Sequence, residues 1–208
     1  MTAIIDYGVG NLFSLTCSFD AIGEKAVVTS DAEVIKQADR IILPGVGAFG
    51  DAAEKLRATG LDKVVIDEAK AGKPLLGICL GMQLLFDKSY EYGEYDGLGL
   101  IEGEIRPIAE VIPASYKIPH IGWNALIYKN DDGGLFRYIK EGDCVYFVHS
   151  FYAAGCDKDT AAVAEYGAPL TAAVVKGNVY GTQFHPEKSG DVGLNILRAF
   201  CERQAEVC

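Results

Sequence analysis

The chain has 208 residues, of which 50% are hydrophobic and 23% charged, and its formal net charge at pH 7 is −10. This composition is typical of a globular protein, and the length suffices for one domain with its own core. The negative charge argues against a nucleic-acid partner, because a phosphate backbone would be repelled. No apolar run approaches membrane-spanning length and no signal peptide is visible, so we expect a cytoplasmic protein that does not bind membranes.

The first half of the chain alternates between apolar strand patterns and amphipathic helix patterns. Strands are predicted at 2–5, 26–29, 40–43 and 75–78, and helices at 12–22, 48–59 and 61–71. Such alternation predicts a parallel α/β sheet. The run Ile41-Ile42-Leu43 is wholly apolar, as expected for a strand covered on both faces.

After about Gly97 the pattern changes to short strands separated by turn residues. They are predicted at 98–105, 125–128, 145–148, 161–165, 171–175 and 178–183, followed by a closing helix over 189–203 with Ser189 as a candidate N-cap. The expected fold is therefore a three-layer α/β domain. Its central sheet is mostly parallel and flanked by helices, with antiparallel strands in the C-terminal half.

Six cysteines are present, and no two of them form a Cys-x-x-Cys pair. They are Cys17, Cys79, Cys144, Cys156, Cys201 and Cys208. The spacing gives no zinc template and no dense disulfide framework, so we expect no bound metal and mostly reduced, structural thiols.

Cys79 is the exception, because it lies in Gly77-Ile78-Cys79-Leu80-Gly81 between a predicted strand and a helix. This matches a nucleophile elbow, in which a tight strand-to-helix turn exposes the nucleophile and glycines on both sides avoid backbone collisions. The N-terminal end of the following helix favours a reactive thiolate. Cys79 is therefore predicted to attack a carbonyl carbon.

A cysteine nucleophile needs a base, and the base needs an orienting partner. His185 follows an apolar strand, and Glu187 lies two positions further on, so that both can face the same side of an extended chain. Cys79, His185 and Glu187 thus form a candidate triad. His149 and His120 are weaker candidates for the base, because neither has a carboxylate close by in the sequence.

The segment Gly45-Val46-Gly47-Ala48-Phe49-Gly50 matches the dinucleotide fingerprint Gly-x-Gly-x-x-Gly. Its context disfavours that interpretation, since it follows the third predicted strand and no acidic residue ends a strand about twenty positions later. A better interpretation is an oxyanion hole. The backbone of this loop at Val46 and the Leu80 N–H would converge on the carbonyl oxygen as it gains charge.

The elbow and the segment His185-Pro186-Glu187 together resemble the class I (triad-type) glutamine amidotransferases. Further motifs extend the resemblance over almost the whole chain and point to one branch of that family. They are Asp6-Tyr7-Gly8-Val9-Gly10-Asn11-Leu12, Pro44-Gly45-Val46-Gly47, Gly81-Met82-Gln83-Leu84-Leu85-Phe86, Ile121-Gly122-Trp123-Asn124, Val148-His149-Ser150-Phe151-Tyr152 and His185-Pro186-Glu187-Lys188-Ser189. The resemblance implies a single amidotransferase domain over 1–208.

The resemblance also implies roles for individual residues. The cysteine, base and acid are Cys79, His185 and Glu187, in agreement with the assignment from the residues. The substrate-binding set implied by the family is Gly45, Gly47, Gln83, Glu91, Ser150 and Phe151. The implied docking surface is Asn11, Trp123, Asn124, Tyr146 and Lys188. Without the family, Gln83 would be taken as an exposed helix residue and the single Trp as equally well a core residue.

The implied reaction is hydrolysis of the L-glutamine side-chain amide through a cysteine γ-glutamyl thioester, with no cofactor. The implied partner is a (β/α)₈-barrel cyclase of histidine biosynthesis, which would receive the ammonia within a heterodimer. We further expect docking to reorient Val46 and complete the oxyanion hole, since flanking glycines make a peptide flip inexpensive.

Three alternatives remain at this point. One is the glutaminase component of another amidotransferase, such as the anthranilate synthase type, and another is a stand-alone cysteine hydrolase of γ-glutamyl compounds. The third is a catalytically silent binding subunit that keeps the fold. The intact triad argues against the last, and Met82 with Ile121-Gly122-Trp123-Asn124 argues against the first.

Overall fold

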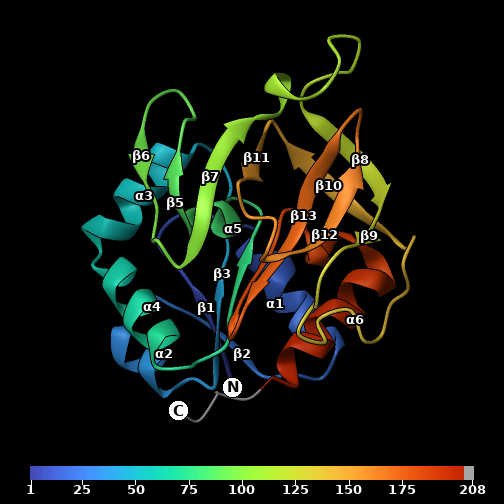
Figure 1. Ribbon diagram of the computed structural model, residues 1–208. Helices are drawn as coiled ribbons and strands as arrows, with labels where there is room; N and C mark the ends of the chain where they lie inside the picture. Colours follow the sequence, from blue (N-terminus) through green and yellow to red (C-terminus); the bar gives the residue numbers. More distant parts are fainter. Residues whose placement is uncertain (204–208) are drawn as a thin grey trace.

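The computed structural model describes residues 1–203, and its centre is an eight-stranded mixed sheet (Figure 1). The strand order is β2-β1-β3-β4-β14-β13-β12-β9. The bounds are β1 (Thr2–Ile5), β2 (Ala26–Thr29), β3 (Arg40–Leu43), β4 (Leu75–Ile78), β9 (Ile127–Tyr128), β12 (Thr160–Glu165), β13 (Pro169–Lys176) and β14 (Val179–Thr182). The first four strands and β14 run parallel, and β13, β12 and β9 continue the sheet in antiparallel pairs.

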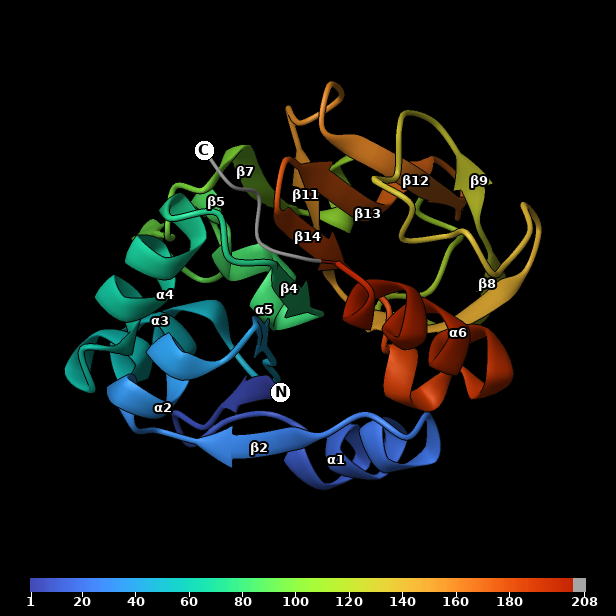
Figure 2. The same cartoon turned by 90° about the horizontal axis from the view of Figure 1, so that it is seen from below.

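Helices cover both faces of this sheet, as Figure 2 shows from below. Three pack with one core cluster: α2 (Ala32–Gln37), α3 (Phe49–Ala58) and α4 (Leu61–Lys70). Two others pack with the second cluster: α1 (Leu12–Ala21) and α6 (Gly190–Cys201). Successive strand residues alternate between the clusters, with Ile5 in one and Ile4 in the other, because side chains along a strand point to opposite faces. The wholly apolar strand pattern in the sequence is explained by this two-sided burial.

The two strands that carry the predicted triad are neighbours. β4 and β14 pair in parallel register, with Ile78 opposite Thr182. β4 ends directly before Cys79, and β14 ends three residues before His185. Since carboxyl ends of adjacent parallel strands meet at one edge of the sheet, the register alone brings the nucleophile and its base together.

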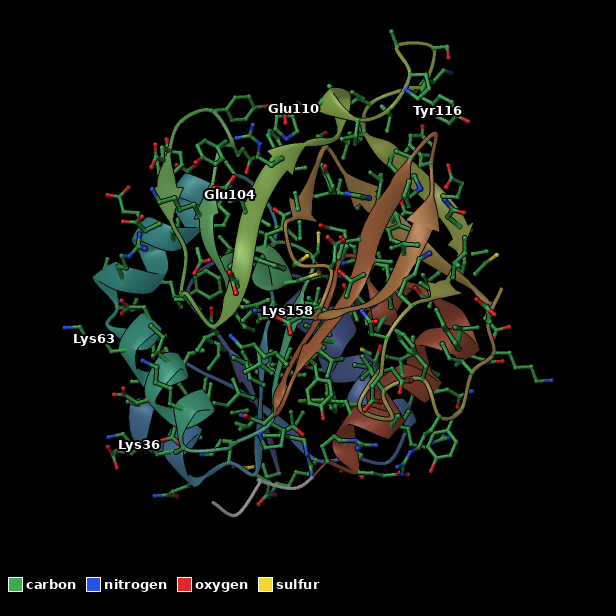
Figure 3. The ribbon with its side chains drawn as sticks, viewed as in Figure 1. Lys36, Lys63, Glu104, Glu110, Tyr116 and Lys158 are labelled. Carbon is green, nitrogen blue, oxygen red and sulfur yellow. The ribbon has the colours of Figure 1, made fainter. Side chains whose placement is uncertain are left out.

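Two smaller sheets build the walls above this edge. A four-stranded sheet has the order β11-β7-β5-β6, and a separate ribbon pairs β10 with β8. The bounds are β5 (Phe86–Ser89), β6 (Tyr95–Asp96), β7 (Ile101–Pro107), β8 (His120–Ala125), β10 (Cys144–His149) and β11 (Phe151–Ala154). The segment from the 3₁₀ turn η1 (Ile108–Glu110) to β8 extends beyond the sheets at the top of the view, where Figure 3 labels Glu110 and Tyr116.

The predicted three-layer α/β fold is confirmed, and several predicted bounds are corrected. The strand expected at 98–105 begins only at Ile101, and the helix expected after Cys79 is short, ending at Leu84 before β5 starts at Phe86. Ser189 occupies the N-cap position of α6, but its side chain does not cap the helix. Its hydroxyl instead donates to the His185 carbonyl at 2.6 Å and accepts from the Tyr146 N–H at 3.0 Å.

No helix in residues 1–203 is long and apolar enough to cross a membrane. The five cysteines in that range are all free thiols, and Cys208 lies outside the described residues. No group of three or more His, Cys, Asp and Glu side chains within 1–203 could hold a metal ion.

Candidate active site

Cys79 forms the turn between β4 and the short helix α5 (Leu80–Leu84). Its backbone has φ 54° and ψ −113°, a conformation that residues other than glycine rarely adopt. The turn is possible because its flanks carry no side chains: a Cβ at Gly77 would lie 2.6 Å from the Gly81 carbonyl oxygen. A Cβ at Gly81 would lie 1.8 Å from the carbonyl oxygen of Leu43. This strained turn is the geometry of a nucleophile elbow.

His185 lies beside the sulfur and is held by Glu187. The His185 Nδ1 and Glu187 Oε1 atoms are 2.8 Å apart, and the two side chains are 3% and 1% exposed. The Cys79 sulfur is close enough to the imidazole to shift its pKa, and both residues line the same pocket. Backbone pairing fixes the arrangement, since the Cys79 N–H donates to the Thr182 carbonyl at 2.7 Å. The structure thus brings the three predicted triad residues into one connected group.

The charge state of His185 follows from competing influences. Burial by itself lowers its pKa, but the interactions with Cys79 and Glu187 and the charges of both partners outweigh burial and raise the pKa to about 10. The imidazole therefore holds a proton at neutral pH. A protonated imidazole beside a sulfur stabilises the thiolate and is ready to protonate a leaving group.

A pocket of about 330 Å³ opens over the triad. Besides Cys79 and His185 it is lined by Val46, Gly47, Leu80, Gln83, Glu91, Tyr92, Pro119, Val148, His149, Ser150 and Phe151. Nearly every residue of the expected substrate-binding set lines this pocket. Gly45 does not: it is buried against α5, where a Cβ would lie 2.6 Å from the Gly81 nitrogen.

The loop predicted to form the oxyanion hole borders the same pocket. Its start is fixed by the buried Tyr7, whose hydroxyl donates to the Pro44 carbonyl at 2.7 Å. Val46 is 41% exposed, and Gly47 has φ 95°, which favours glycine. The loop is thus anchored at Pro44, exposes Val46 and has at Gly47 a backbone conformation that favours glycine.

Glu91 reaches the pocket from the segment after β5. Its Oε2 atom accepts the Phe49 N–H at the start of α3 at 2.7 Å. Burial raises the pKa of its carboxyl, and this hydrogen bond opposes the shift. The Glu91 carboxylate is thus oriented by a helix N-terminus, which is the end that favours negative charge.

Gln83 is buried rather than exposed, which contradicts what its helical position alone suggests. Its Nε2 donates to the Phe151 carbonyl at 3.2 Å and to Gln183 Oε1 at 2.9 Å. The Gln183 amide then donates from Nε2 to Cys79 Sγ at 3.8 Å. Sequence reasoning missed Gln183, although it precedes His185 by two positions, the spacing that puts two side chains on one face of an extended chain.

The two remaining histidines, His120 and His149, are not placed to act as the base for Cys79. His149 contacts the Phe151 carbonyl and His120, at 2.8 and 2.9 Å, and neither histidine is oriented by a carboxylate. His185 is therefore the base that this geometry supports.

The expected docking residues divide into two groups. Trp123 is 57% exposed and lies 6.2 Å from the Tyr146 ring, over which Lys188 Nζ lies at 5.8 Å. These three form one surface on β8, β10 and the turn η2 (Pro186–Lys188). Asn11 precedes α1, and Asn124 points to the opposite face of β8 from Trp123, where its amide is hydrogen-bonded.

Comparison with known proteins agrees with this geometry. The family model "Glutamine amidotransferase class-I" matches residues 3–203. A solved glutamine amidotransferase superimposes with a TM-score of 0.74 at 20% identity, covering 96% of this chain and 97% of the other. PurLQS from Thermotoga maritima superimposes with a TM-score of 0.72 at 21% identity, covering 96% of each chain. These structures share the fold, and the chain belongs to the class I glutamine amidotransferases.

More similar relatives define the branch. The imidazole glycerol phosphate synthase subunit HisH of Wolinella succinogenes is 49% identical over 97% of this chain and 99% of that protein. The same subunit of Caldanaerobacter subterraneus subsp. tengcongensis is 50% identical over 97% of this chain and 98% of that protein. Within its family the chain thus falls in the HisH branch, as the motif around Trp123 predicts.

Proposed function

We propose that the chain is the glutaminase subunit of an imidazole glycerol phosphate synthase. The observation that carries the proposal is the strained Cys79 turn beside a buried His185–Glu187 pair at the base of a pocket. The near-complete match to relatives of that name supports the branch. The substrate would be L-glutamine, and its products glutamate and ammonia.

The reaction begins when the Cys79 thiolate attacks the side-chain amide carbon of glutamine. The carbonyl oxygen gains negative charge, which the backbone N–H groups of Val46 and Leu80 would stabilise. His185 donates its proton to the amide nitrogen, and ammonia leaves as the C–N bond breaks. A γ-glutamyl thioester remains on the sulfur.

Water then completes the cycle. Neutral His185 accepts a proton from the water that attacks the thioester carbon, and the C–S bond breaks to regenerate the thiolate and release glutamate. Glu187 holds the imidazole in the required orientation and stabilises its charged form throughout. No step requires a metal or organic cofactor.

The far end of glutamine would be recognised by acceptors. Both Gln83 donors are engaged, so its remaining polar atom toward a ligand is Oε1, an acceptor. Together with the Glu91 carboxylate it suits the α-ammonium group. Ser150, the Phe151 backbone and Gly47 would surround the rest of the substrate.

Ammonia would pass to a (β/α)₈-barrel cyclase making imidazole glycerol phosphate and aminoimidazole carboxamide ribotide. We propose that this cyclase docks on the surface formed by Trp123, Tyr146 and Lys188, with Asn11 at its edge. An exposed tryptophan is a frequent anchor of protein interfaces. Docking would reorient Val46, so that the isolated subunit is a poor glutaminase.

Glutamate release measured with and without a cyclase subunit tests the proposal. We expect release only with the cyclase and its nucleotide ligand, and none with Cys79→Ala in the same complex. Equal release without a cyclase would indicate a stand-alone hydrolase, and release by Cys79→Ala would exclude the thioester mechanism.

A further inference from the structure

Two of the three histidines of the chain have no part in the triad, yet both are buried beside the pocket. His120 begins β8 and His149 ends β10, where they lie opposite each other in the antiparallel ladder. His120 Nδ1 and His149 Nε2 are 2.9 Å apart. Because buried polar groups are normally hydrogen-bonded, the partners of the two rings determine which ring nitrogens carry a proton.

The pocket end fixes the proton positions. His149 Nδ1 is 2.8 Å from the Phe151 carbonyl oxygen, which can only accept, so Nδ1 carries a proton. In the neutral ring Nε2 is then bare and accepts from His120 Nδ1. His120 is therefore also protonated at Nδ1, and its bare Nε2 accepts from the Asn124 amide at 3.2 Å.

The hydrogen bonds of Asn124, at the other end of this chain of groups, independently require the same donor-to-acceptor direction. The Asn124 Oδ1 accepts the Ala125 N–H at 2.8 Å, and its Nδ2 donates to the Glu165 carbonyl at 2.9 Å. The amide nitrogen must therefore face His120. Every group from Asn124 to the Phe151 carbonyl is satisfied only when both histidines are neutral, because an added proton would place two donors against each other.

We propose that His120 and His149 are positioning residues for the glutaminase reaction: as a neutral relay, each protonated at Nδ1, they hold the Phe151 carbonyl and thereby the Gln83 side chain against the substrate. The inference rests on the proposed function for its substrate, but the tautomers follow from the hydrogen bonds alone.

The Phe151 carbonyl is the junction of the relay and the pocket. It accepts from both His149 and Gln83, and Gln83 also holds Gln183, which contacts the Cys79 sulfur. The buried His149 ring holds the Phe151 carbonyl in place, and this carbonyl in turn holds Gln83 in one rotamer. The Gln83 Oε1 atom is therefore already oriented toward the substrate before the substrate binds. Preorganisation of this kind improves ligand binding more than it changes the chemistry.

The surroundings of the relay favour neutral rings. His120 is stacked between Phe147 and Tyr166, with ring centroids 4.8 and 4.2 Å away. Burial lowers the pKa of His120 to about 4 and is the main cause that lowers that of His149 to about 4; the nearby His120 and His185 add to the latter shift, while the bond to Phe151 opposes it.

Nitrogen NMR of the wild-type chain tests the tautomers directly. With three histidines, the imidazole signals can be assigned from single His variants. We expect His120 and His149 to show a protonated Nδ1 and a bare Nε2 at pH 7, the tautomer that free neutral histidine disfavours. A protonated Nε2 on either ring would overturn the relay whether or not the protein is a glutaminase.

Kinetics of the complex with a cyclase test the positioning role. His149→Leu removes the donor to Phe151 and should raise KM for glutamine about tenfold while kcat changes less than about threefold. His149→Asn keeps an N–H near the position of Nδ1 and should restore KM to within about threefold of wild type. Tyr166→Phe is the matched control, because it retains the stacked ring and removes only the hydroxyl bond to Lys117.

Alkylation of Cys79 by iodoacetamide separates positioning from damage to the nucleophile. We expect equal alkylation rates in wild type and His149→Leu. A His149→Leu enzyme with unchanged KM, or one that His149→Asn does not rescue, would refute the positioning role. A wild-type complex that releases no glutamate would refute the proposed function and leave the NMR result standing.

Discussion

Gln183 connects the nucleophile to the substrate pocket through a single side-chain amide. One end donates to the Cys79 sulfur, and the other accepts from Gln83, so the amide orientation is fixed by its partners. The side chain is fully buried. A donor placed against a thiolate stabilises the negative charge, and a side chain fixed in this way needs no rearrangement during the reaction.

Replacement of Gln183 by leucine should lower kcat for glutamine hydrolysis by about tenfold or more, since it removes the donor to sulfur and leaves Gln83 with an unpaired amide hydrogen. Steady-state glutamate release in the cyclase complex measures the effect. Thr182→Val is the matched control on the neighbouring position: the Thr182 hydroxyl is buried with no partner, so its loss should leave activity and stability unchanged or slightly improved. Equal kcat for wild type and Gln183→Leu would exclude this role.

Residue-level prediction succeeds where the motif itself carries the geometry. The glycines around Cys79 and the two-residue spacing of His185 and Glu187 are visible in the sequence, and the structure brings these side chains together. Gln183 was missed because its role depends on the register between β4 and β14, which pairs residues about a hundred positions apart. The orientation of the Asn124 amide likewise depends on a distant segment, because its Nδ2 donates to the Glu165 carbonyl, 41 positions away.

At the scale of elements, the elbow depends on the close approach of α5 to the loop after β3. A Cβ at Gly81 would lie 1.8 Å from the Leu43 carbonyl oxygen, and one at Gly45 would lie 2.6 Å from the Gly81 nitrogen. Both obstacles are backbone atoms, which cannot turn aside as a flexible side chain can. The glycines thus set how near the nucleophile lies to the predicted oxyanion loop.

We expect Gly81→Ala to lower the free energy of unfolding by about 3 kcal/mol or more, because the backbone must shift to admit the methyl group. Urea denaturation measures the loss, and glutaminase activity should disappear with it. Gly142→Ala is a suitable control: its φ is 90° but nothing lies within 4 Å, so only the conformational cost of about 1 kcal/mol applies. Equal losses in both variants would contradict the close-approach argument.

Elements were predictable where their pattern was uninterrupted. The apolar strands β1, β3 and β4 match their predicted bounds, whereas β8 was recognised only at its end, because Pro119 and Gly122 obscure its strand pattern. Helix α2 and strands β5, β6 and β11 were not foreseen. For β5 the reason is physical: its first residue, Phe86, continues the apolar pattern of α5, and tertiary packing rather than local preference ends the helix at Leu84.

At the scale of the whole molecule, the buried neutral histidines make stability depend on pH. Their pKa values of about 4 in the folded protein lie below the ordinary value of 6.5, so the unfolded chain binds more protons between these limits. The stabilisation is present above pH 6.5 and is lost as the pH falls toward 4. His185 has a raised pKa and acts in the opposite direction: its contribution is present below pH 6.5 and is lost as the pH rises through about 10.

Each buried neutral histidine should therefore add up to about 1.4 kcal/mol per pH unit to the fall in unfolding free energy between pH 6.5 and 4. Urea denaturation at several pH values measures the slope. His149→Asn should show a shallower slope than wild type by up to that amount. Parallel slopes in the two proteins would mean that His149 is not the neutral, protected ring described above.

Residues 204–208 lie outside the described structure, so the expectation of one domain over 1–208 stays a prediction. The docking residues likewise remain predicted. The sequence left open whether Trp123 lies in the core or on the surface, and the structure places it on the surface. A partner surface cannot be deduced from one chain's pattern, since its complement lies on another molecule.

The pairing of β4 with β14 fixes the positions of the nucleophile and its base, whereas the pocket walls are built from other segments. The nucleophile and its base extend from adjacent strands of one ladder, in the middle of an eight-stranded sheet covered on both faces. The pocket walls come from the loop after β3 and the ends of separate, smaller sheets. A docked partner would therefore tune turnover by adjusting walls around an invariant centre, and variants with altered ammonia output should be sought in those walls.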